Sequence, residues 1–480
     1  MFLALAYKRE TEVGNEGRMT SAAGRDGETF RGGALIPILF FIAPLFTAAA
    51  PRLAPFFLPI VAFVLIIVAL RRGLPWRELL QPNAAMAALV AVALYAGLSA
   101  IWAEDPDGAL SKASLLIAAT LVVFAAAAAI PTLDKTQVRR ASLAFVAGAL
   151  CAAGFVMTEL LTDGALTRFA MNTIPAFRPD RAKHVAIRHG LVTKINVSEF
   201  NQHVAMLALQ FWPGLLALRV LALPRRNLLT ALFFLALAVP IAISEHDSSQ
   251  VGLIASLIIF PLTLVRPRAV IRGLAIAWCL GFVLVIPLDF LAFKAGLHQA
   301  DWLPKSARAR IIIWEYTAER VLENPVLGIG ADSTPAVKAK AVAAPEKPEG
   351  FVFRRTTGQH AHNLFLQSWY ELGLFGTILV AIAGAAAALR LLLLPLEAQA
   401  YGAAAFTLFA VIAAFAWGMW QVWLVCAIGL LPLYLLMPAA LLSSGEGKSG
   451  ARVSMTRDKL RGASANRMPQ DARLIEAWPD

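Results

Sequence analysis

Long apolar stretches, separated by short polar connections, dominate the pattern of this chain. A helix that crosses a bilayer needs roughly 20 mainly apolar residues. The pattern predicts about twelve such helices, at residues 33–50, 54–70, 84–102, 113–131, 141–161, 198–218, 228–244, 249–265, 271–291, 363–389, 401–419 and 421–440. We therefore expect an all-α polytopic membrane protein, with its last two helices joined by a tight turn around Trp417–Gln421.

The polar segments divide the chain into five parts. These are a polar leader (1–32), transmembrane spans one to nine (33–291) with a basic loop at 162–197, a large loop (292–362), spans ten to twelve (363–440) and a basic tail (441–480). Both long loops are expected on the same side of the membrane.

Composition supports the membrane assignment, because 59% of residues are hydrophobic and only 15% are charged, against about a quarter in soluble domains. The net charge of +12 does not indicate a nucleic-acid partner, since Lys and Arg collect in cytoplasmic loops of membrane proteins. Alternate connections do carry them, at Arg71, Arg72, Arg77, Lys135, Arg139, Arg140, Arg225, Arg226, Arg266, Arg268, Arg272 and Arg390. This bias predicts a multi-pass membrane protein with both termini cytoplasmic.

The two long loops then face outward, away from the cytoplasm, although both are basic. Long loops are only weakly governed by the charge bias, so a tolerated excess is one interpretation. The other is an anion-binding site that faces outward.

Two imidazoles stand where the large loop meets the tenth span, in His360-Ala-His362-Asn363. Histidine can accept a proton from a hydroxyl near neutral pH. A catalytic base at the membrane rim is therefore predicted, and the spacing leaves open which of the two histidines it is.

An amphipathic helix is predicted upstream, over Lys305–Glu323. Arg310 and Trp314 lie one turn apart, so they share a face. This pair suits a diphosphate headgroup at the bilayer surface. On spacing alone, an ordinary interfacial helix with a snorkelling arginine is the better interpretation.

The same residues resemble the O-antigen ligase family of bacterial inner-membrane enzymes. The family pattern of His-Asn, nine residues, Gly, two residues and Gly matches His362-Asn363, Gly373 and Gly376. Upstream, Arg310-x-x-x-Trp314 and Pro325-x-x-Gly328-x-Gly330 are similar to two further family elements.

The resemblance implies a C-type membrane glycosyltransferase fold and an inverting, metal-independent transfer that uses no cofactor. Glycan would pass from undecaprenyl diphosphate to lipid A–core at the periplasmic face. His362 would act as base and Arg310 would hold the diphosphate, with His360, Asn363 and Trp314 contacting substrate.

One departure from the family concerns the donor site. The family often has a Ser-Arg pair where spans seven and eight meet, and this chain has Ser244–Gln250 without an arginine. The missing cation would then come from elsewhere, with Arg181 and Arg188 as candidates.

Three other functions are compatible with the sequence. A polysaccharide polymerase of the same superfamily would share the loops and the chemistry. A glycolipid transporter or flippase would show internal repeats and charges in mid-span, and neither is evident. A non-catalytic scaffold would not depend on His362.

Overall fold

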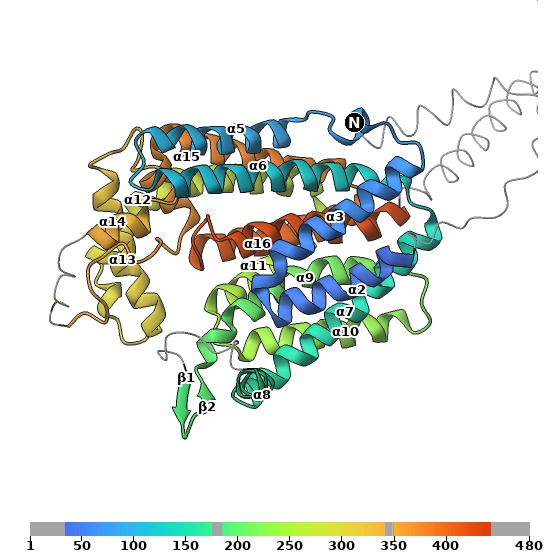
Figure 1. The fold of residues 1–480 in the computed structure, drawn as a ribbon, viewed down its shortest axis with the longest axis horizontal. Coiled ribbons are helices and arrows are strands. Elements are labelled where there is room, and N and C mark those ends of the chain that lie inside the picture. Colours follow the sequence, from blue (N-terminus) through green and yellow to red (C-terminus); the bar gives the residue numbers. More distant parts are fainter. Residues whose placement is uncertain (1–33, 175–184, 341–347, 349, 443–480) are drawn as a thin grey trace, which may run out of the picture.

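The computed structural model describes residues 34–174, 185–340, 348 and 350–442. Over these residues the chain is almost entirely helical, and the long helices run side by side in one elongated bundle (Figure 1). Eleven of the described helices are long and apolar enough to cross a membrane. The prediction of an all-α polytopic membrane protein is therefore confirmed.

Every predicted span corresponds to a helix. These helices are α2 (Leu35–Ala49), α3 (Ala54–Arg71), α5 (Ala84–Leu98), α6 (Pro106–Ala129), α7 (Lys135–Leu161), α9 (Asn201–Val220), α10 (Arg226–Ile243), α11 (Asp247–Val265), α12 (Pro267–Lys294), α15 (Leu364–Arg390), α16 (Leu396–Phe415) and a last described helix at Val422–Leu442. Among them α2 has only 15 residues. It is about 22 Å long, which is less than the roughly 30 Å hydrocarbon core of a bilayer.

Capping residues start two helices earlier than the apolar pattern predicts. The carboxylate of Asp105 accepts from the backbone N–H of Gly108 at 2.9 Å, and Pro106 follows as the first helical residue. Asp134 caps α7 through the backbone N–H of Gln137 at 2.8 Å. Each cap satisfies a free N–H group of the first turn, so the helix begins in polar sequence before the apolar stretch.

One end of the bundle carries both long loops, as the left side of Figure 1 shows. The basic loop forms α8 (Ala165–Thr173) and an antiparallel pair of strands, β1 (Val185–Arg188) and β2 (Leu191–Ile195). The large loop forms α13 (Lys305–Val321), the predicted amphipathic helix, and α14 (Thr334–Lys340). We call this side of the molecule the loop end. The polar leader and the basic tail lie outside the described residues, apart from the last few residues of the final helix.

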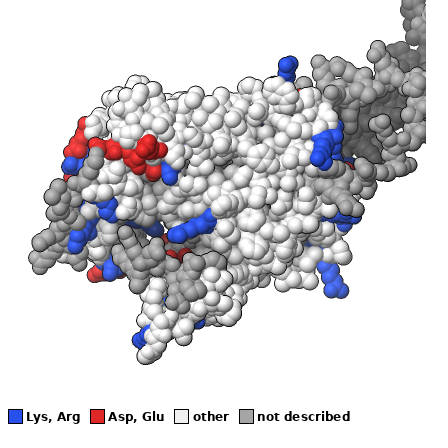
Figure 2. Space-filling view, viewed as in Figure 1, with Lys and Arg blue, Asp and Glu red and all other residues white. Residues whose placement is uncertain are grey.

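The surface between the two ends is largely uncharged. Figure 2 shows Lys, Arg, Asp and Glu gathered toward the loop end and the opposite edge, with a broad white stretch between them. The helices also expose many large apolar side chains, among them Phe56, Phe63, Leu94, Ile258 and Val283. An uncharged, apolar band of this kind is what a helical bundle presents to lipid.

Buried apolar side chains form two main clusters. One joins α2, α3, α7 and α9 to the last described helix, and the other joins α5, α12, α13 and α15. The connection at 416–421, between α16 and the last helix, contributes Ala416 to the first cluster and Trp420 to the second. We call these six residues the return connection.

Helix α15 is broken at Gly373, where the backbone has φ 62° and ψ −163°. The segment 325–330 lies against the break: the N–H groups of Ile329 and Gly330 donate to the carbonyls of Tyr370 and Glu371, at 3.1 and 2.9 Å. In a continuous helix these two carbonyls would accept hydrogen bonds from backbone N–H groups further along α15. Here the N–H groups of Ile329 and Gly330 take their place. The segment with Gly328 and Gly330 therefore packs against the middle of α15, within the helical bundle.

Candidate active site

Residues 360–363, which we call the histidine loop, lie at the loop end between two helices. The indole Nε1–H of Trp314, on α13, donates to the carbonyl of Ala361 at 2.8 Å. The side-chain oxygen of Asn363 caps α15 by accepting from the N–H groups of Phe365 and Leu366, at 3.0 and 3.2 Å. The histidine loop is thus held between α13 and the first turn of α15.

His362 has one ring nitrogen engaged and one available. Its Nδ1 lies 2.5 Å from the carbonyl oxygen of Ala416 in the return connection. A carbonyl only accepts, so Nδ1 carries the proton and Nε2 keeps its lone pair. Among the described residues, none forms a hydrogen bond with that Nε2. Such a nitrogen is in the correct state to accept a proton.

The backbone at His362 is strained, with φ 54°. Left-handed conformations are uncommon outside glycine and cost about 1–3 kcal/mol when the surroundings impose them. Here the bond from Trp314 to Ala361 and the cap at Asn363 hold the residues on either side. Strained backbone of this kind clusters at functional sites.

His360 differs from His362 because both of its ring nitrogens are engaged. Its Nδ1 accepts from the N–H of His362 at 3.3 Å, and its Nε2 lies 3.1 Å from the side-chain amide of Gln421. The Gln421 oxygen is buried without a partner among the described residues. Placing that oxygen toward His360 lets Nε2–H donate to it and satisfies both groups. The ring lies 4.0 Å from that of His362, centroid to centroid, so His360 is suited to holding the loop.

Arg310 is the cation shared by these imidazoles. Its positive charge reaches His360, His362 and also His246, at the turn between α10 and α11. It forms no ion pair or hydrogen bond within the part of the chain that the structure describes, although the carboxylate of Asp247 lies near enough to attract it. A partly buried guanidinium without a partner is a ready anion-binding group.

Burial is the main reason that the histidines at this site are uncharged. It lowers the pKa of His362 to about 4 and that of His360 to about 3, and Arg310 adds to both effects. His360 also lies within reach of the positive charge of Lys338 on α14. Both imidazoles are therefore neutral near pH 7, which is the state in which a histidine can act as a base.

These lowered pKa values predict that the protein becomes less stable as the pH falls from about 7 to 4.5. In the unfolded chain, histidines take up a proton near pH 6.5. In the folded chain, His362 does so only near pH 4, and His360 only near pH 3. Because the unfolded state binds more protons than the folded state in this window, the free energy of unfolding decreases as the pH falls.

Melting temperatures of the purified protein across this pH range measure the effect. The matched control is the double variant His360→Gln and His362→Gln, which should lose less stability on acidification. An equal loss in both proteins would contradict the assignment of these two histidines as buried and neutral.

Glu371 ties the surrounding segments together behind the histidines. Its fully buried carboxylate accepts from the backbone N–H of Asp332 at 2.8 Å, from Gln367 at 3.0 Å, and from the side chains of Thr334 and Trp420. The buried polar side chains Gln367 and Glu371, near the start of α15, therefore belong to a hydrogen-bond network that joins α15, the large loop and the return connection. These are structural contacts between helices.

The structure places the predicted site residues in two groups. Arg310, Trp314, His360, His362 and Asn363 lie together, although the contacts of Trp314 and Asn363 are with the protein itself. Arg188 stands on the exposed strand β1, with no described contact to the histidine loop, and Arg181 lies outside the described residues.

Sequence patterns did not single out two further members of this site, His246 and Lys338. Neither belongs to a motif, and only the fold brings α11 and α14 to the histidine loop. The signal that could have indicated His246 is its place in the polar turn between two predicted spans, Ser244–Gln250.

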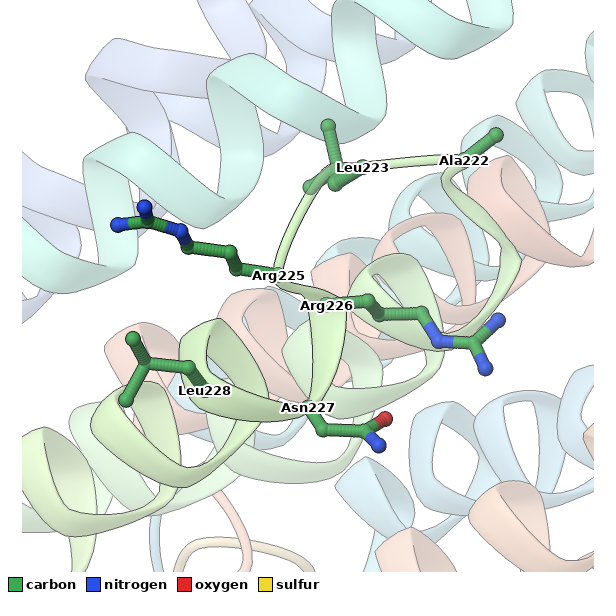
Figure 3. A pocket seen from close by; sticks show the side chains of 6 residues that line it. All are labelled: Ala222, Leu223, Arg225, Arg226, Asn227 and Leu228. Carbon is green, nitrogen blue, oxygen red and sulfur yellow. The ribbon is translucent and has the colours of Figure 1, made fainter.

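Among the described residues, neither a metal cluster nor a hollow at the opposite end of the bundle offers a converging set of side chains as an alternative to this site. Within the described residues, no three His, Cys, Asp or Glu side chains are grouped as metal ligands. A hollow of about 340 Å³ lies at the connection between α9 and α10, away from the loop end, lined by Ala222, Leu223, Arg225, Arg226, Asn227 and Leu228. Figure 3 shows its two arginines pointing in opposite directions, so they do not converge on a ligand.

The fold and the site together define a polytopic membrane protein with neutral histidines and a partly buried arginine at one end of the bundle. Comparison with known proteins agrees: residues 228–381 match the family model described as O-Antigen ligase. These residues include Arg310, His362 and both family glycines of α15.

A named relative points the same way. The chain is 24% identical over 263 residues to a Rickettsia conorii protein named "Putative polysaccharide ligase". That match spans 53% of this chain and 56% of the relative, little more than half of either. The resemblance to the O-antigen ligase family is thereby confirmed.

Proposed function

We propose that the chain is an inverting glycosyltransferase that moves a glycan from undecaprenyl diphosphate onto lipid A–core. The observation that carries this proposal is that His362 and Arg310 lie in one neighbourhood. Among the described residues, His362 Nε2 has no hydrogen-bond partner and Arg310 forms no ion pair. A base and an anion-binding cation are the two groups that such a transfer requires.

In the proposed reaction, His362 Nε2 takes the proton from an acceptor hydroxyl as its oxygen attacks the anomeric carbon. The bond from that carbon to the diphosphate oxygen breaks, and the diphosphate leaves with the electron pair. Attack from the face opposite the leaving group inverts the configuration. Arg310 stabilises the negative charge that develops on the diphosphate.

Two features of this mechanism come from the chemistry of the leaving group. A diphosphate bound by a guanidinium is a weak base, so its departure requires no general acid. The charge that a divalent ion would otherwise neutralise is met by Arg310, and we therefore propose a metal-independent reaction.

We further propose that the loop end faces the periplasm and that the protein resides in the bacterial inner membrane. Short basic connections at the opposite end, among them Arg71–Arg72, Arg139–Arg140 and Arg225–Arg226, support a cytoplasmic location for that end. The donor and the acceptor would both reach the site from the bilayer.

The lipopolysaccharide pattern of a strain deleted for this chain tests the proposal. The deletion should lose glycan-capped lipid A–core while carrier-linked glycan chains are still made, and the wild-type chain should restore capping. If instead single repeat units still reach the core and only long polymer disappears, the protein is a polymerase. Unchanged glycans with an altered distribution of carrier lipid across the membrane would indicate a transporter.

A further inference from the structure

His246 is a buried imidazole that the proposed reaction does not use. It stands between α10 and α11, its side chain is 2% exposed, and its Nδ1 lies 2.7 Å from the hydroxyl oxygen of Ser249. Its Nε2 is buried and has no hydrogen-bond partner among the described residues. Buried polar atoms are almost always paired, so this nitrogen requires an explanation.

The ring of His246 is rigidly oriented. It stacks on Trp417 of the return connection, with ring centroids 4.7 Å apart and planes inclined by 22°. The backbone N–H of His246 donates to the Ser244 hydroxyl oxygen at 3.2 Å, and that hydroxyl donates to the carbonyl of Ile241 at 2.7 Å. Turning Nε2 toward a different partner would therefore break the stacking or the contact with Ser249.

This unpaired nitrogen lies in the same neighbourhood as the guanidinium of Arg310, whose charge acts on the imidazole. Asp247, the next residue, attracts Arg310 and accepts a hydrogen bond from the Ser306 hydroxyl at 3.1 Å. The Asp247–Ser306 hydrogen bond therefore holds the turn that carries His246 against α13, one helical turn from Arg310. His246 Nε2, a possible N–H donor, and the Arg310 guanidinium both lack a hydrogen-bond partner among the described residues.

We propose that His246 binds the diphosphate of the lipid-linked donor, its Nε2–H donating to a phosphate oxygen beside those held by Arg310. This inference rests on the proposed function. If the Ser249 hydroxyl donates to Nδ1, the ring proton is fixed on Nε2, where it faces the anion.

A neutral donor fits this position better than a second guanidinium would. Two guanidinium groups in a partly buried site repel each other when no anion is bound. In this chain Asp247 balances the charge of Arg310, and a neutral His246 adds a hydrogen bond without adding charge. The site therefore requires no bound anion to balance its charge.

Binding of glycan-free undecaprenyl diphosphate to the purified full-length chain tests the inference, with undecaprenol as the probe that lacks phosphate. His246→Phe keeps a flat ring against Trp417 but removes the N–H. It should weaken binding of undecaprenyl diphosphate by roughly tenfold to a hundredfold, the value of one hydrogen bond to a charged group, and leave undecaprenol binding unchanged.

His246→Gln and His246→Met are a matched pair if the phenylalanine variant does not fold. The two side chains have similar volumes, and only Gln presents an N–H. The Gln variant should bind undecaprenyl diphosphate at least about tenfold more tightly than the Met variant. Equal affinities for the two would overturn the assignment.

Arg310→Ala separates this inference from the proposed function. If Arg310→Ala loses binding while His246→Phe binds as the wild type does, His246 does not contact the diphosphate and the proposed function stands. If neither variant differs from the wild type, the donor site itself is wrong, and the role of His246 is wrong with it.

Discussion

Replacing His362 by alanine is expected to lower the rate of glycan transfer by about 10²–10⁴-fold, the usual contribution of a positioned general base. The variant loses the one imidazole of the histidine loop whose Nε2 has no hydrogen-bond partner among the described residues, while Nδ1–H is held by Ala416. The measurement is the initial rate of transfer at matched protein levels. Donor affinity should change little, because Arg310 remains.

His360→Ala is the matched control for this prediction. Both nitrogens of His360 are already engaged, with the N–H of His362 and with Gln421. Its loss should lower the rate by no more than about tenfold, the effect of losing one or two hydrogen bonds that hold the loop. A variant pair in which His360→Ala is inactive and His362→Ala is active would assign the base to the other histidine.

The second large effect is expected from Gly373→Ala, which should destabilise the protein by about 3 kcal/mol or more. Its conformation, φ 62° and ψ −163°, is available essentially to glycine alone and costs other residues about 1–3 kcal/mol. A Cβ would also stand 2.3 Å from the carbonyl oxygen of Val326 and 2.6 Å from the backbone nitrogen of Gly328. Overpacking of this kind costs about 1–3 kcal/mol more.

Thermal unfolding in detergent, together with the yield of monodisperse protein, measures this loss. Gly273→Ala on α12 is the matched control, because no atom lies within 4 Å of the point where its Cβ would stand and its backbone is helical. That variant should be as stable as the wild type or slightly more stable. A Gly373→Ala protein with unchanged melting temperature would show that α15 is not broken as described.

The hydrophobic pattern predicts the spans well because length and apolarity are sufficient to define a transmembrane helix. The ends of the helices were less accurate. Asp105 and Asp134 start α6 and α7 within polar sequence, and α16 ends at Phe415 rather than continuing to residue 419. Caps and connections depend on local hydrogen bonds, to which an apolar window is insensitive.

The break in α15 could not be predicted from hydropathy. Residues 363–389 are apolar throughout most of their length, so the pattern predicts one continuous helix. The break depends on contact between Gly373 and the backbone of Val326 and Gly328, which lie far earlier in the chain. Such a contact is formed only in the tertiary structure. The only sign of it in the sequence is the spacing of the glycines.

The candidate site was predicted where its residues share a motif. Arg310 and His362 were found in this way, and the structure places them in one neighbourhood. The choice between His360 and His362 required the partners of each nitrogen, which lie in the return connection at Ala416 and Gln421. No spacing within the histidine loop contains that information.

Transfer by the purified protein tests the central claim most directly. The full-length chain would be reconstituted in liposomes with glycan-labelled undecaprenyl diphosphate and lipid A–core, in the presence of a chelator of divalent metal ions. The account predicts labelled lipid A–core with inverted anomeric configuration from the wild type and almost none from His362→Ala. Equal transfer by the two proteins, retained configuration, or a strict requirement for added divalent metal would contradict it.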